Sequence, residues 1–135
     1  MKHWIILFAL MPALSYAGDQ LEIKAHSAKF DMKVVAFGNA IIVKRQDNGK
    51  SLRCLYSEKI DSVDGKSLEP VTIWDYNKCN LISDGDVTPV EGLISIIKTL
   101  SSKQYELIII GPDKFIPVTE LSLSYPLTDV QVKMQ

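Results

Sequence analysis

Apolar and polar residues alternate along most of this chain, and a period of two predicts β-strands. Residues 21–26 alternate strictly, and within 128–134 so do residues 130–134, as in strands with one face in water. Residues 105–110 instead form a continuous apolar run, which suits a strand covered on both faces. By these patterns we expect strands within residues 21–26, 33–46, 51–57, 60–63, 68–81, 105–110, 115–124 and 128–134.

Turn signals separate these runs. Asp47-Asn48-Gly49-Lys50 and Val63-Asp64-Gly65-Lys66 each place glycine after Asn or Asp, the preferred chemistry for a hairpin turn. Gly38-Asn39 interrupts the run at 33–46 and is either a tight hairpin turn or a bulge within one long strand. The number of strands depends on which alternative holds.

One segment, Thr88 to Ser101, predicts a helix. Thr88 is a suitable N-cap, Pro89 fits the first helical position, and Glu91 completes a capping box. An apolar stripe follows at helical spacing, formed by Val90, Leu93, Ile94, Ile97 and Leu100. The expected fold class is therefore α+β: a mostly antiparallel sheet of about seven strands with one packed amphipathic helix.

The N-terminus has the layout of a secretory signal peptide. Lys2 and His3 precede an apolar run that begins at Trp4, and Ser15-Tyr16-Ala17 supplies small residues for cleavage. We therefore expect residues 1–17 to be a signal, with cleavage near Ala17, and 18–135 to form one globular domain. The predicted location is periplasmic or secreted, without stable membrane insertion after signal removal.

Two cysteines, Cys54 and Cys79, lie in the predicted mature part. In an exported protein such a pair predicts a disulfide. A thiol redox pair is disfavoured because the spacing is far from C-x-x-C. A zinc site is disfavoured because His26 is the only histidine left to complete it.

Charge argues against nucleic acid as the partner. The full chain has 15 Lys+Arg and 16 Asp+Glu. Removing the signal takes away one Lys, so the predicted mature charge is 14 − 16 = −2. Nucleic-acid binding relies on neutralising phosphates with clustered cations, which this balance does not favour.

Catalytic signals are weak. His26 lies on the polar face of the first expected strand, and Asp84 and Asp86 flank Gly85 in an expected turn. Aspartate is favoured beside glycine simply as a turn former. No glycine-rich phosphate loop and no nucleophile elbow is present. We expect no enzyme activity, no metal and no cofactor, and a small hydrolase that uses these residues is the least favoured alternative.

Aromatic residues near the expected disulfide are the first candidate binding residues. Trp74, Tyr76 and Tyr56 lie close to Cys79 or Cys54 in sequence. Rigid aromatic side chains make good contacts because they lose little entropy on binding. The alternative is that Trp74 packs on the disulfide inside the core.

Basic residues on the hairpin at Asp47–Lys50 are the second candidates. Lys44, Arg45 and Arg53 flank this turn and are expected to form a small patch that suits an acidic partner. The alternative is a solvated hairpin tip without a partner.

A short segment, Phe37-Gly38-Asn39-Ala40-Ile41-Ile42-Val43, resembles the glycine-asparagine strand segment of OstA-like periplasmic proteins. The match covers about seven residues in a single copy. The resemblance implies a β-jellyroll groove and a role in carrying lipopolysaccharide.

By elimination, we expect an exported, non-enzymatic binding protein of the bacterial envelope that acts by contact with another periplasmic or secreted protein. An inhibitor or an immunity protein against an envelope-targeting toxin or enzyme is the expected kind. A component of envelope assembly or of lipid and glycan transport is the alternative. The sequence names neither the partner nor the oligomeric state.

Overall fold

The computed structural model describes residues 20–117, 119 and 124–133, which form one ten-stranded antiparallel sheet. The strand order is β10-β1-β2-β3-β4-β5-β7-β8-β9, and β6 pairs with β5 off this path. The elements are β1 (Glu22–Ser27), η1 (Lys29–Asp31), β2 (Met32–Phe37), β3 (Ala40–Arg45), β4 (Ser51–Val63), β5 (Pro70–Ser83), β6 (Asp86–Val90), β7 (Leu93–Thr99), β8 (Gln104–Ile110), β9 (Tyr125–Pro126) and β10 (Thr128–Lys133).

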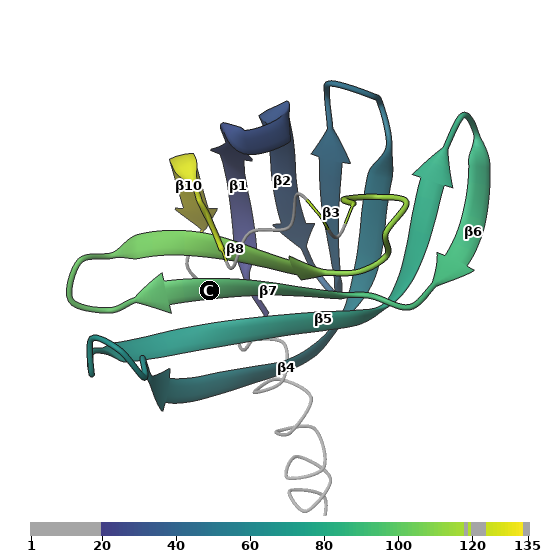
Figure 1. Cartoon of the computed structure of the whole chain (residues 1–135). Coiled ribbons are helices and arrows are strands. Elements are labelled where there is room, and N and C mark those ends of the chain that lie inside the picture. The colour runs from purple at the N-terminus through teal and green to yellow at the C-terminus, as the bar shows by residue number, and fades with distance from the viewer. Residues whose placement is uncertain (1–19, 118, 120–123, 134–135) are drawn as a thin grey trace, which may run out of the picture.

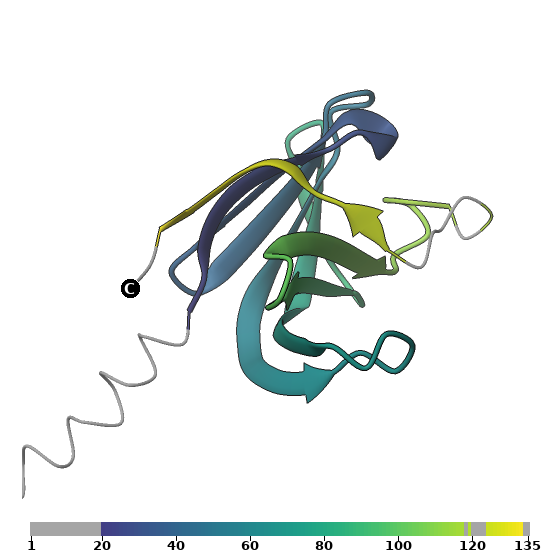
Figure 2. The same cartoon turned by 90° about the vertical axis from the view of Figure 1, so that its left-hand side faces the viewer.

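The sheet folds over into two packed layers because two long strands run through both. In Figure 1, β10, β1, β2 and β3 stand upright at the back, while β7 and β8 lie crosswise in front. The first half of β4 pairs with β3, and its second half pairs only with the first half of β5. Figure 2 shows from the side that β7 and β8 (green) lie in a different layer from β1 (purple) and β10 (yellow). The arrangement is a nearly closed barrel with orthogonal layers.

The corner between the layers carries the disulfide. The pairing of β4 with β5 shifts register between Arg53 and Leu55 and again between Tyr56 and Glu58. Such bulges bend a strand and increase its twist. Cys54 and Cys79 lie at the first shift, with Cα atoms 4.1 Å apart, and form the predicted disulfide. The cross-link therefore fastens the two long strands at the point where both turn from one layer to the other.

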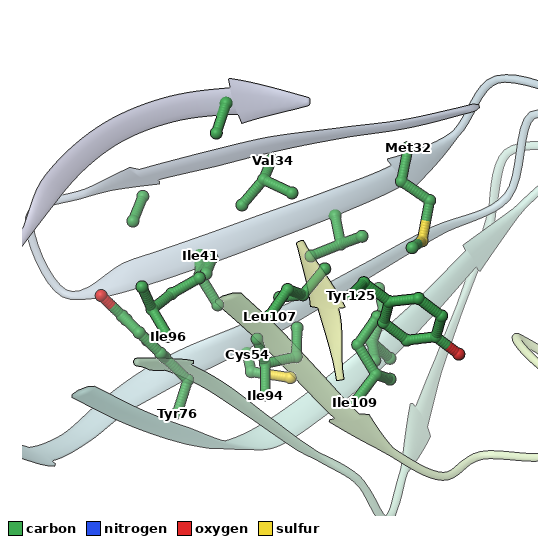
Figure 3. Close-up of a cluster of buried hydrophobic side chains, with 14 of the residues drawn as sticks. Met32, Val34, Ile41, Cys54, Tyr76, Ile94, Ile96, Leu107, Ile109 and Tyr125 are labelled. Atoms are coloured by element: carbon green, nitrogen blue, oxygen red, sulfur yellow. The ribbon is translucent and has the colours of Figure 1, made fainter. Parts of the chain in front are cut away.

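One hydrophobic core fills the space between the layers (Figure 3). Met32, Val34 and Ile41 enter from the back layer, while Ile96 and Leu107 enter from the front layer. All five side chains are fully buried. The inward positions follow the strict alternation that the sequence predicts for the back layer.

The predicted helix at Thr88–Ser101 is wrong, because these residues form strands β6 and β7. Asp84 and Gly85 have φ angles of 50° and 83°, which makes a tight turn between β5 and β6. Thr88 and Pro89 then pair with Leu81 and Asn80 rather than capping a helix. Pro89 is tolerated because β6 is an edge strand that pairs only with β5.

The apolar stripe misled because β7 is apolar on both faces. Ile94 and Ile96 point into the core, whereas Leu93 and Ile97 point outward. Apolar residues on alternate sides at 93, 94, 96 and 97 reproduce part of a helical spacing. β-Branched isoleucines favour the extended form. The fold is thus mostly antiparallel β, with ten strands instead of about seven and no α-helix within the described ranges.

The hairpin predictions are confirmed. Asp47–Lys50 joins β3 to β4, and Val63–Lys66 begins the connection from β4 to β5. Gly38-Asn39 is a hairpin turn and not a bulge, since Phe37 pairs directly with Ala40. Gly38 has a φ of 61°, a conformation that glycine adopts without strain.

Two further predictions need correction. Residues 115–117 form no strand, and Phe115 and Ile116 are instead buried in a loop. The run at 105–110 forms β8, but Tyr105, Leu107 and Ile109 alone are buried and Ile110 is 54% exposed. No helix of the described residues covers the second face of this strand, because residues 86–99 form β6 and β7.

The predicted signal peptide, residues 1–17, lies outside the described part of the chain, as does Gly18. Among the residues that the structure does describe, no helix has both the length and the hydropathy needed to cross a bilayer.

Candidate binding surfaces

The predicted aromatic binding residues lie on the inner side of β4 and β5. Trp74 is 8% exposed and Tyr76 is fully buried. The half-buried Tyr56 meets Tyr76 edge to face, with ring centroids 5.7 Å apart. The structure therefore brings Tyr56 and Tyr76 together, but as part of the core packing and not as an exposed contact surface.

The Tyr76 side chain contains an unusual polar group. Its hydroxyl is buried without a hydrogen-bond partner among the residues described. Burial, with a smaller contribution from Tyr56, raises the pKa of Tyr76 well above its usual range. This hydroxyl stays protonated at physiological pH and does not act as a titrating group.

The three predicted basic residues divide between the two sides of the sheet. Lys44 and Arg53 point outward from β3 and β4, where they occupy positions diagonal to each other across the strand pair. Arg45, next in sequence to Lys44, points to the opposite side because strand side chains alternate. The structure thus groups two of the three and separates the third.

Arg45 closes one end of the barrel. Its guanidinium donates two hydrogen bonds to the Asp47 carboxylate, at 3.0 and 2.7 Å, and one to the carbonyl oxygen of Phe115, at 2.6 Å. It also lies 4.2 Å from the ring centroid of Phe30. These contacts connect the β3–β4 turn to the loop after β8. The positive charge of Arg45 is thus paired within the protein, and its role is structural.

The outward side of the back layer carries most of its charge as cations, and we name it the basic face. Cross-strand pairing places Lys24, Val35, Ile42 and Arg53 in one row across β1 to β4. Phe37 is 71% exposed and Ile42 is 40% exposed on this side. The face comprises the cations Lys24, Lys33, Lys44, Arg53 and Lys133, the apolar residues Val35, Phe37 and Ile42, and the carboxylate of Glu22.

A shallow hollow of about 380 Å³ opens on the basic face beside β10, β1 and β2. Lys24 and Lys133 line it together with Val35 and Phe37. A second hollow next to it includes Lys33 and, at the margin, Asp129. The basic face is therefore uneven, with cations around an apolar strip.

The outward side of the front layer has the opposite charge, and we name it the acidic face. Ile60, Ile73 and Ile97 form one row across β4, β5 and β7, which Glu106 of β8 continues. The next row contains Glu58 and Asp75. The face comprises Glu58, Asp75 and Glu106 with Ile60, Ile73, Leu93, Ile97, Ile108 and Ile110, and no Lys or Arg stands at an outward position of these paired segments.

The acidic face is apolar where an antiparallel sheet normally meets water with polar side chains. Ile60, Ile73, Ile97 and Ile108 are partly buried, and Ile110 is 54% exposed. Ser95 lies among them and donates a hydrogen bond of 2.6 Å to Asp75, which fixes that carboxylate. Contiguous apolar surface of this kind marks a contact site more often than a bare surface.

Sequence reasoning missed the acidic face, although the signal was present. The continuous run at 105–110 predicts apolar residues on both faces of a strand, and residues 93–97 have the same property. The helix prediction at Thr88–Ser101 concealed β7, and with it the outward apolar row that β7 shares with β5 and β8.

The candidate catalytic residues are apart. His26 of β1 pairs with Asp31, with its Nε2 2.6 Å from the carboxylate. Asp84 and Asp86 lie at the exposed β5–β6 turn, with β2, β3 and β4 between them and His26 in the sheet. No group of three or more His, Cys, Asp or Glu side chains within the described ranges is arranged to hold a metal ion.

Comparison with known proteins assigns no family to this chain. No family model, no curated protein and no solved structure matches this chain.

Proposed function

We propose that this protein is an exported, non-catalytic binding protein that acts by protein–protein contact, as an inhibitor or an immunity protein against an envelope-targeting toxin or enzyme. The acidic face carries the proposal. At the outward positions of its described strands it combines an aliphatic surface with three carboxylates and no cation, so it suits a partner whose own surface is apolar with a basic rim.

The interior argues for contact at the surface over enclosure of a ligand. Side chains from both layers fill the space between them, and large ones among them, such as Tyr76 and Tyr125, are fully buried. The barrel is thus a packed core, as in small barrels whose interior is just wide enough for side chains. What this chain offers to another molecule is the outside of its two layers.

The test uses tagged mature protein to capture partners from a periplasmic extract. One partner should be recovered with the unmodified protein and with Leu68→Lys, an exposed control position at the tip of the β4–β5 hairpin. It should be lost with Glu58→Lys/Ile110→Lys, which changes the charge and removes apolar area on the acidic face.

Purified partner then gives the affinity of each variant by calorimetry. We expect a reduction of at least about 100-fold for the acidic-face double variant, since it removes apolar contact and introduces repulsion. Equal capture by all three proteins, or capture of nothing, contradicts the proposal.

A second candidate function follows from the hollow on the basic face. Cationic Lys24 and Lys133 beside Val35 and Phe37 suit an anionic amphiphile, and Phe37 begins the segment that resembles OstA-like proteins. A lipid or glycan carrier would retain such a ligand during native mass spectrometry and lose it in Lys24→Glu/Lys133→Glu. Absence of any retained ligand in the unmodified protein rejects this alternative.

A further inference from the structure

We propose that the acidic face of one molecule docks on the basic face of a second copy of this chain. The inference rests on the proposed role of the acidic face as a protein-binding surface. It goes beyond that role by naming a partner whose chemistry is already present in the same molecule.

Charge is the first argument. The basic face presents five cations against Glu22, with Asp129 at its margin. The acidic face presents three carboxylates against no cation. The outward positions of the two layers therefore carry opposite charge, and opposite potentials favour docking of one face on the other.

Apolar area is the second argument. Each face has an apolar strip among its charges: Val35, Phe37 and Ile42 on one, and the isoleucine row of β4, β5 and β7 on the other. Phe37 and Ile42 are the most exposed apolar residues of the basic face, and Ile110 is the most exposed on the acidic face. Charge complementarity around an apolar centre is the usual anatomy of an interface.

Geometry decides the mode of assembly. The two faces are the outer sides of packed layers, so they point away from each other (Figures 1 and 2). Pairing of like faces would bring three carboxylates against three, or five cations against five. Docking of unlike faces leaves one free face at each end, so the contact is heterologous and extends into open chains.

The experiment measures mass by sedimentation velocity across a concentration series at about 20 mM and about 500 mM NaCl, since salt screens the attraction. The unmodified mature protein should form dimers and longer chains at low salt and should dissociate at high salt. Lys24→Glu/Arg53→Glu and Glu58→Lys/Ile110→Lys each remove one face and should be monomeric. Leu68→Lys should assemble like the unmodified protein.

Mixing the two monomeric variants is the decisive step. One retains an intact acidic face and the other an intact basic face, so an equimolar mixture should form a one-to-one dimer and nothing larger. Circular dichroism and disulfide content of each variant establish that both are folded.

Two results overturn the inference: an unmodified protein that stays monomeric at low salt over the whole series, or a mixture that stays monomeric. Either result leaves the proposed function standing if the acidic-face variant still loses the captured partner. Assembly of copies with no captured partner supports this inference and contradicts a foreign target.

Discussion

The basic and acidic faces belong to one sheet and share the strands β4 and β5, yet the side chains that they expose to water differ. On the basic face, β2 and β3 place Lys33 and Lys44 at the outward positions together with Val35, Phe37 and Ile42, over a buried inner row. On the acidic face, isoleucines stand at outward positions on strands whose inner side is already apolar. Both layers therefore carry apolar side chains outward, and they differ in the charge around them: cations on the basic face and carboxylates on the acidic face.

The two long strands show the change within a single element. In its second half, β5 places Asn80 outward on the basic side, where it pairs with Arg53. In its first half, β5 places Ile73 outward between Ile60 and Ile97. The surface character therefore changes at the corner that the disulfide fastens, which shows that composition follows the layer and not the strand.

The largest expected effect comes from that corner. Cys54→Ala/Cys79→Ala opens a loop of 25 residues and should lower the free energy of unfolding by about 3–4 kcal/mol, through the added entropy of the unfolded chain. Urea denaturation of the variant and of the oxidised protein measures the difference. A difference near zero would mean that the two layers do not need the cross-link at their shared corner.

A neighbouring pair on β7 separates core from surface. Ile96→Ala removes a fully buried side chain and should cost about 3 kcal/mol, whereas Ile97→Ala removes a half-buried one and should cost about 1 kcal/mol or less. Thermal and urea unfolding of the isolated monomer give both values. Equal losses would show that the acidic face is covered as deeply as the core, which contradicts an open surface.

Substitutions of Tyr76 test the effect of its buried hydroxyl on stability. Tyr76→Phe removes a buried hydroxyl that finds no partner among the described residues, and it should raise the free energy of unfolding by about 1 kcal/mol. Tyr76→Leu keeps an apolar side chain but loses the edge contact with Tyr56, and should lower stability by at least about 1 kcal/mol. Destabilisation by Tyr76→Phe would show that the hydroxyl has a partner.

The smallest effect concerns the charged end of the back layer. The hydrogen bond from Arg45 is the main cause that lowers the pKa of Asp47 below its ordinary 3.8. A lowered folded-state pKa contributes stability above the unfolded pKa and loses it as pH falls through the folded value. Because this carboxylate is 39% exposed, Asp47→Asn should cost only about 0.5 kcal/mol at neutral pH.

Acid unfolding checks the sign. The difference between the unmodified protein and Asp47→Asn should shrink as pH falls below about 4 and should be small at about pH 2.5, since protonation removes the charge in both states. A difference that grows in acid would show that Asp47 stabilises the fold through something other than its charge.

Much of the fold could be predicted because local chemistry decided it. Asn48-Gly49 and Asp64-Gly65 mark turns through backbone preferences that do not depend on the rest of the molecule. The cysteine pair follows from the expected oxidising location. Residues 21–26 and 128–134 alternate clearly because one of their faces is wet, and they become the neighbouring strands β1 and β10.

The helix prediction failed where that local information was ambiguous. Thr88, Pro89 and Glu91 fit a capping box, but the edge of a sheet also accepts proline and threonine. Ile94 and Ile97 fit a helical stripe only if Ile96 is ignored. The choice was decided by pairing with β5, a contact between residues distant in sequence.

The candidate binding residues show a related limit. The residues around Trp74 are apolar on both sides of the strand, so the alternation of apolar and polar residues alone does not reveal which side is buried. Lys44 and Arg45 are different, because consecutive strand residues point to opposite faces and strict use of that rule would have separated them. Recognising the acidic face requires knowing how β4, β5, β7 and β8 pair, and no local sequence pattern gives this information.

The route of β4 and β5 through both layers has a consequence for proteolysis. Leu68, 75% exposed, lies at the tip that joins these strands, between Cys54 and Cys79 in the chain. A single cut at this tip would separate the polypeptide into two pieces that remain joined through the sulfur bridge and the sheet. The nick would become visible on a gel only after reduction, and neither piece would carry a complete layer away with it.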